Sequence, residues 1–96
     1  MRRGESLSPG KSASSERAAS LLERRRRAAE ERLGMPVIVR GVRTPDASWK
    51  GRLYRRRGRV IIEYQISQSG FFWHAPIVER LLDAAGEGQT EAVIPA

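Results

Sequence analysis

The spacing of apolar residues changes at Gly34 and Pro36 from a helical pattern to the alternation of a strand. This change decides what kind of fold the chain can form. Before it, residues 14–33 are mostly Ala, Leu, Glu and Arg, which favour helix. After it, apolar and polar residues alternate as they do in half-buried strands. Gly and Pro at this spacing end a helix. The sequence therefore predicts an α+β fold, with an Arg-rich helix over residues 14–34 and a small α+β domain over residues 35–96.

The predicted helix has a narrow apolar side. Its stripe consists of Ala18, Leu22, Ala29 and Leu33. A helix with so little to bury gains little from packing, so we expect an exposed N-terminal helix. It would project from the domain, dock by one edge, or be held by a partner. Residues 1–13 contain almost nothing to bury, and we expect them to form a disordered basic tail.

Three strands are expected in succession after this helix. They cover Val37 to Arg43, Trp49 to Arg55 and Arg59 to Ser67. A loop rich in turn residues separates the first two strands, and Arg57-Gly58 provides a tight turn between the second and third. Because consecutive strands with short connections usually lie side by side, we expect a three-stranded antiparallel β-meander.

The turn at Arg57-Gly58 determines which residues of the second and third strands face each other. The expected pairs are Leu53 with Ile62, Gly51 with Tyr64, Trp49 with Ile66 and, on the other face, Arg52 with Glu63. The Tyr64 ring would cover the missing side chain of Gly51, and the last pair combines opposite charges. A slip by one residue would mix polar and apolar faces, which disfavours the alternative register.

The last quarter of the chain predicts an amphipathic helix packed on the sheet and a short C-terminal strand. The apolar face of this helix consists of Ile77, Val78, Leu81, Leu82 and Ala85. Pro76 suits its start, and Gly86 and Gly88 end it. Residues 90–95 are expected to form a strand parallel to the third strand and beside it, after a right-handed crossover. A place beside the first strand is the alternative.

Positive charge is concentrated in the strand region. Residues 37–59 contain seven Arg and one Lys against Asp46 alone, whereas after residue 60 Arg80 stands against five acids. A concentrated positive patch attracts polyanions, and the formal net charge of +7 favours anionic partners. The alternative interpretation is that part of the Arg excess reflects a GC-rich genome and not selection for binding.

The outer face of the predicted hairpin is the candidate site. Cations with an interleaved aromatic residue on a two-stranded ribbon suit phosphate contact and base stacking. The predicted nucleic-acid-binding residues are Lys50, Arg52, Tyr54, Arg55, Arg56, Arg57 and Arg59. The alternative interpretation is that these charges keep an exposed sheet face soluble and prevent aggregation through strand edges.

Two other segments allow both a functional and a structural interpretation. The run Arg24 to Arg27 points around the whole helix and is balanced by neighbouring acids, so we favour a solvated face over a basic arm. Residues 71–74, Phe-Phe-Trp-His, are expected to seat the second helix on the sheet, with a base-stacking platform as the alternative. His74 is the only histidine, and no acid lies near it in the sequence.

We therefore predict a small non-enzymatic nucleic-acid-binding protein whose partner is DNA or RNA. The alternative is a protein-interaction or regulatory subunit of a larger assembly, with a protein partner or a second copy of the chain. No catalytic residue, metal site, cofactor or small-molecule substrate is predicted. The chain has no cysteine and no apolar run of membrane-spanning length, so we expect a cytoplasmic location and no membrane partner.

Overall fold

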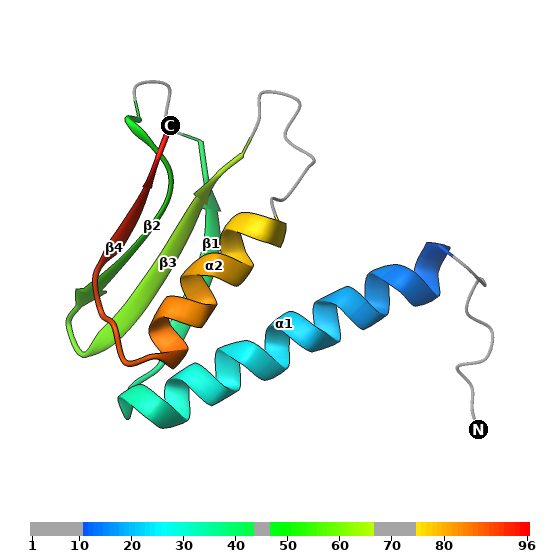
Figure 1. The fold of residues 1–96 in the computed structure, drawn as a ribbon, viewed down its shortest axis with the longest axis horizontal. Coiled ribbons are helices and arrows are strands. Elements are labelled where there is room, and N and C mark those ends of the chain that lie inside the picture. Colours follow the sequence, from blue (N-terminus) through cyan, green and yellow to red (C-terminus); the bar gives the residue numbers. More distant parts are fainter. Residues whose placement is uncertain (1–10, 44–46, 67–74) are drawn as a thin grey trace.

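The computed structural model describes residues 11–43, 47–66 and 75–96. Its elements are α1 (Lys11–Leu33), β1 (Val37–Val42), β2 (Trp49–Arg56), β3 (Arg59–Gln65), α2 (Ala75–Gly86) and β4 (Ala92–Pro95). The strands form one mixed sheet in the order β1-β3-β2-β4. One face of the sheet is covered by α2, and α1 runs alongside α2 (Figure 1). The expected α+β class is confirmed.

The position of β1 differs from the expected meander. β1 does not pair with β2; it runs parallel to β3 and lies on the far side of it. The expectation of a three-stranded antiparallel meander is therefore wrong. Charge and burial explain the difference. Beside β3, Val37 faces buried Val60 and Arg40 faces Glu63, whereas beside β2 the same arginine would have met a strand that carries four cations.

The neighbour of β4 also differs from the expectation. β4 runs parallel to β3 in direction, as expected, because both strands are antiparallel to β2. However, it pairs with β2 at the edge of the sheet and not with β3 or β1. Both sides of β3 are already occupied, one by β2 and the other by β1. The outer side of β2 is thus the position left beside the hairpin.

The register of the β2–β3 hairpin is confirmed. Leu53 faces Ile62, Gly51 faces Tyr64 and Arg52 faces Glu63, as the alternation of apolar residues requires. The pairing of these two strands begins at Gly51 and does not extend to the expected pair of Trp49 and Ile66. Where β2 meets β4, a bulge lies between Trp49 and Gly51.

The space above Gly51 is filled from α2 and not by Tyr64. A Cβ atom at Gly51 would lie 2.5 Å from Ile77 Cγ2 and 3.0 Å from Leu81 Cδ1. The Tyr64 ring lies instead over the other strand glycine, since a Cβ at Gly41 would be 3.1 Å from Tyr64 Cζ. Each glycine therefore marks a close approach of a large side chain to the sheet.

The hydrophobic core lies between the sheet and the helices. Its buried members are Leu22, Ala29, Val37, Leu53, Val60, Ile62, Val78, Leu81, Leu82 and Ala85. They include four of the five predicted apolar residues of α2, and Ile77 packs against them. Leu22 and Ala29 of the narrow stripe are buried too, so the second half of α1 is docked and not exposed. Its first turns extend past the sheet and α2 (Figure 1).

The ends of α1 differ slightly from the expected bounds. The helix begins at Lys11, so residues 11–13 belong to it and not to a tail; residues 1–10 and the segment 71–74 lie outside the described residues. It ends at Leu33, and the next residue, Gly34, has a left-handed φ of 70° and donates its amide in a 2.8 Å hydrogen bond to the Glu30 carbonyl. The Glu30 carboxylate then accepts the Val37 amide at 2.9 Å, which ties the helix end to the start of β1. No helix among the described residues is long and apolar enough to cross a membrane.

Candidate functional site

The face of the sheet away from α2 carries the candidate site, and we call it the open face. No described helix packs on it. Strand alternation and side-chain contacts place these residues on it: Arg40, Arg52, Tyr54, Arg56, Arg59, Ile61 and Glu63. Glu63 is the only acid in the four strands. The open face is therefore strongly cationic.

Glu63 is buried at the centre of this face, with 3% of the residue exposed. Arg40 donates to its Oε2 from Nε at 2.9 Å and from Nη2 at 2.7 Å. Arg52 Nε donates to Oε1 at 2.8 Å, and the Tyr54 hydroxyl donates to Oε2 at 3.1 Å. A buried carboxylate is stable only when such donors surround it, so these bonds fix the positions of both arginines.

The ionisation of Glu63 follows from this balance. Burial alone would raise the pKa of its carboxyl group, but the hydrogen bonds from Arg40, Arg52 and Tyr54 outweigh burial and hold the pKa below its ordinary value. The same contact with Glu63, helped by Tyr54, raises the pKa of the Arg40 guanidinium. Glu63 is thus an anion that holds two cations in place and leaves the face with an excess of positive charge.

Arg52 lies between two aromatic rings. Its guanidinium carbon is 4.6 Å from the centroid of the Trp49 ring and 4.9 Å from that of Tyr54, distances typical of cation–π contacts. The sequence pattern assigned Trp49 to the core with Leu53, whereas the structure sets it against Arg52. The bulge beside Gly51 interrupts the alternation at this point, and sequence alone contains no signal for it.

The turn end of the open face carries unpaired arginines. Arg56 and Arg59 are directly opposite each other, and Arg57 follows in the turn with a φ of 52°. Within the described part of the chain, these three side chains form no ion pair. Together with Arg40 and Ile61 they line a hollow of about 200 Å³. Guanidinium groups without acid partners are free to bind an external anion.

The predicted site residues are therefore divided between four places: the open face, the turn, the bulge and the helix side of β2. Arg52, Tyr54 and Arg56 lie on the open face with Arg59, Arg57 lies in the turn, and Lys50 is exposed beside the bulge. Arg55 shares the alternation of Leu53, so it belongs to the helix side, where its side chain is exposed. Arg40 was missed by sequence reasoning because its place on this face depends on the parallel pairing of β1 with β3.

Apart from Glu63, the acids after residue 60 do not pair with the arginines of the hairpin within the described residues. Asp83 on α2 pairs instead with Arg25 of α1, with Nη1 and Oδ1 2.7 Å apart. In the same described ranges, neither Glu79 nor Glu87 forms an ion pair with an arginine of the hairpin. The positive charge of the open face is therefore opposed there by Glu63 alone.

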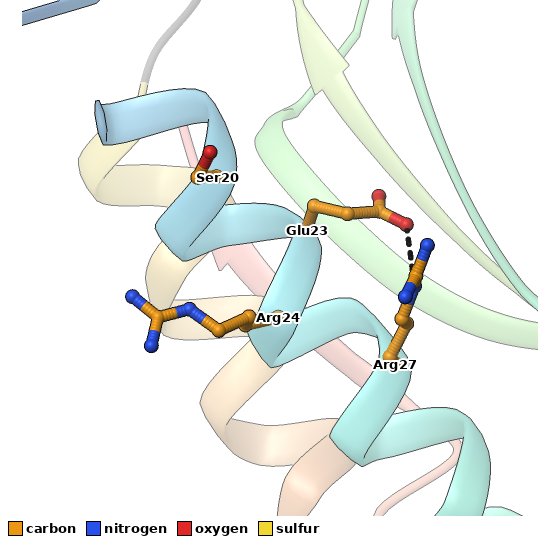
Figure 2. Close-up of a pocket in the computed structure, with 4 residues that line it drawn as sticks. All are labelled: Ser20, Glu23, Arg24 and Arg27. Atoms are coloured by element: carbon orange, nitrogen blue, oxygen red, sulfur yellow. Dashed lines mark hydrogen bonds and ion pairs between the residues drawn. The ribbon is translucent and has the colours of Figure 1, made fainter. Parts of the chain in front are cut away.

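The arginine run of α1 is a solvated face only in part: Arg24 and Arg27 are exposed, whereas Arg25 and Arg26 are half-buried. Arg26 bonds to Glu23 and Glu30, and Arg27 bonds to Glu23 at 3.1 Å. The bond from Arg26 is the main reason that the pKa of Glu23 falls to about 2. Figure 2 shows Arg24 pointing away from the ion pair of Glu23 and Arg27. These charges largely satisfy one another, and they lie on the opposite side of the sheet from the open face.

Comparison with protein-family models, with curated proteins and with solved structures finds no match for this chain. Among the described residues, no group of three His, Asp or Glu side chains could hold a metal ion. His74 lies outside the described residues. Any assignment of function to the described site therefore depends on the open face itself.

Proposed function

We propose that this protein binds nucleic acid through the open face of its sheet and the adjoining turn. The observation that carries the proposal is that cations and two aromatic rings lie together on a sheet face that no described helix covers. Glu63 is the only acid in these strands and is buried beneath them. Cationic sheet faces with aromatic side chains suit a flexible polyanion whose bases can stack.

The arginines and the aromatic residues would have different roles in binding. Arg56, Arg57 and Arg59 would neutralise phosphates, since no described acid competes for them. The rings of Trp49 and Tyr54 would stack on bases or sugars, and Arg52 between them is held in place by Glu63. The alternative of a protein-interaction module is less well supported, because Leu22 and Ala29 of the narrow apolar stripe are already buried in the core.

The proposal is tested by fluorescence anisotropy with labelled single- and double-stranded DNA and RNA at several salt concentrations. The test variant replaces Arg56, Arg57 and Arg59 by Gln. The matched control replaces three exposed helix arginines by Gln, namely Arg17, Arg24 and Arg80, and so removes the same charge elsewhere.

We expect the hairpin variant to bind at least about tenfold more weakly than the wild type. The slope of log K against log salt concentration should also become less steep, since each neutralised phosphate contributes about −0.9 in a duplex or about −0.7 in a single strand. The control should retain most of the affinity. Equal losses in both variants would show that only net charge matters. A wild-type protein that fails to bind any of the four nucleic acids at micromolar concentration and low salt would end the proposal.

A further inference from the structure

The geometry points to a more specific role for the hollow at the turn: we infer that it binds a phosphate monoester dianion, such as the terminal phosphate of a nucleic-acid strand. This inference rests on the proposed function for the identity of the strand. The hollow itself is defined independently of it, by Arg40, Arg56, Arg57, Arg59 and Ile61.

Four arginines line one hollow of about 200 Å³. Three of them, Arg56, Arg57 and Arg59, form no ion pair within the described residues. The fourth, Arg40, is fixed by Glu63 through Nε and Nη2. One arginine held by Glu63 and three arginines without a described acid partner give a partly preorganised anion site with adjustable donors.

Among the described residues, Ile61 is the one apolar residue that lines the hollow. Ile61 belongs to the open face yet is only 6% exposed, although it is not part of the main core. It lies opposite Tyr54 and Ile38 in the sheet and is one of the residues that line the hollow. Arginine stems commonly pack on apolar surface while their charged ends stay in water. Such packing would direct the guanidinium groups around the hollow.

The turn keeps these charges close together at a cost in folding stability. Arg56 and Arg59 form a like-charge pair directly opposite each other, an arrangement that destabilises a hairpin. Arg57 has a left-handed φ of 52° before Gly58 at 77°, positions that tight hairpins normally fill with Asn-Gly or Asp-Gly. Local arrangements that oppose stability concentrate at functional sites. Solubility alone would not require three arginines at these positions.

Charge matching selects the ligand class. An internal phosphodiester carries one negative charge, whereas a phosphate monoester carries about −1.5 to −2 at pH 7 and offers three acceptor oxygens. Guanidinium groups bind such oxygens in pairs of parallel hydrogen bonds. Four arginines that line one small hollow therefore match a monoester better than a chain-internal phosphate.

The inference is tested with oligonucleotides of one sequence that carry a 5′-phosphate, a 3′-phosphate or hydroxyl groups at both ends. A nucleoside monophosphate is titrated separately by calorimetry. The test variant is Arg57→Asn, which suits the left-handed turn and keeps the fold. The matched control is Arg55→Asn, which removes the same charge two residues away on the helix side of β2.

We expect one of the phosphorylated oligonucleotides to bind at least about fivefold more tightly than the hydroxyl form, with the difference lost in Arg57→Asn and kept in Arg55→Asn. If no oligonucleotide binds but the nucleoside monophosphate binds in a way that depends on Arg57, the phosphate site stands and the proposed function fails. If oligonucleotides bind regardless of their end groups and the monophosphate does not bind, the proposed function stands and this inference is overturned. Absence of binding in both arms overturns both.

Discussion

Arg40 and Arg52 lie on opposite sides of Glu63, one on β1 and the other on β2, and they bind different oxygens of its carboxylate. Arg40 Nη2 is 2.7 Å from Oε2, and Arg52 Nε is 2.8 Å from Oε1. The three residues form one row across three neighbouring strands. A single buried carboxylate therefore links the parallel and the antiparallel halves of the sheet through side chains.

Replacing Glu63 by Gln should destabilise the fold by about 1–3 kcal/mol, because two arginines lose their anion. The loss stays below that of a fully buried pair because 51% of the Arg40 side chain and 41% of the Arg52 side chain are exposed. Urea denaturation measures the free energy of unfolding. Glu87→Gln, at an exposed site, is the control and should change it by less than about 0.5 kcal/mol. Equal stability of the Glu63 variant and the wild type would contradict the role assigned to this carboxylate.

The stability of the protein should also fall in acid, in part through Glu63. The folded-state pKa of this carboxyl group lies below its ordinary value of 4.5, so the unfolded chain takes up the proton first. Its contribution to the free energy of unfolding is therefore complete above about pH 4.5 and disappears as the pH falls through the lowered folded pKa. Thermal melts across this range should show a smaller acid dependence for Glu63→Gln than for the wild type. An identical dependence in both would be evidence against the lowered pKa.

The docking of α1 is tested by two neighbouring leucines. Leu22 is 7% exposed against α2 and the core, whereas Leu21 is 38% exposed. Leu22→Ala should reduce the free energy of unfolding by about 2–3 kcal/mol through lost burial and a residual cavity. Leu21→Ala should change it by less than about 0.5 kcal/mol. Similar small effects in both variants, measured by urea denaturation, would mean that the helix is not docked in solution.

The close approach of α2 to β2 predicts that Gly51 does not tolerate a side chain. A methyl group there would lie 2.5 Å from Ile77 Cγ2, so Gly51→Ala must displace α2 side chains and should cost about 1–3 kcal/mol. At Gly86, at the end of α2, a Cβ atom would meet no described atom outside its own helix backbone and chain neighbours within 4 Å, and Gly86→Ala serves as the control. The change in melting temperature measures the loss of stability in each variant. A Gly51 variant as stable as the control would rule out this packing.

The turn predicts a substitution that stabilises the protein. Arg57→Asn relieves a left-handed conformation that Asn tolerates better and removes one of three clustered charges, so the free energy of unfolding should rise by about 0.5–1 kcal/mol. Arg55→Asn should leave stability unchanged or lower it, because Asn is disfavoured in strands. Urea denaturation at low salt compares the two variants. Destabilisation by Arg57→Asn would show that the Arg57 side chain supports the fold.

The hairpin could be predicted in detail because its signals are local. The Arg57-Gly58 turn and the alternation along β2 and β3 permit only one register that keeps Leu53 and Ile62 on the buried side. The apolar face of α2 followed from its helical spacing for the same reason. The chemistry of Arg52 was partly accessible too, since its pairing with Glu63 follows from that register.

The order of the strands could not be predicted, because it depends on contacts between segments far apart in the sequence. Nothing near Arg40 indicates that it will lie beside Glu63, 23 residues later. The contact of Trp49 with Arg52 depends on a bulge, which interrupts the alternation that sequence reasoning uses. The hollow at the turn combines both difficulties, since one of its arginines comes from β1.

The parallel pairing of β1 with β3 also determines the order in which the strands can pair during synthesis. β1 leaves the ribosome before its partner exists, and it stays without a neighbouring strand until residues 59–65 have followed. The hairpin, whose contacts are short-range, is then expected to form first and to serve as the template for both outer strands. A nascent chain that stops at Gly58 should accordingly leave the β1 amides open to hydrogen exchange, and protection of those amides in such a fragment would contradict this order.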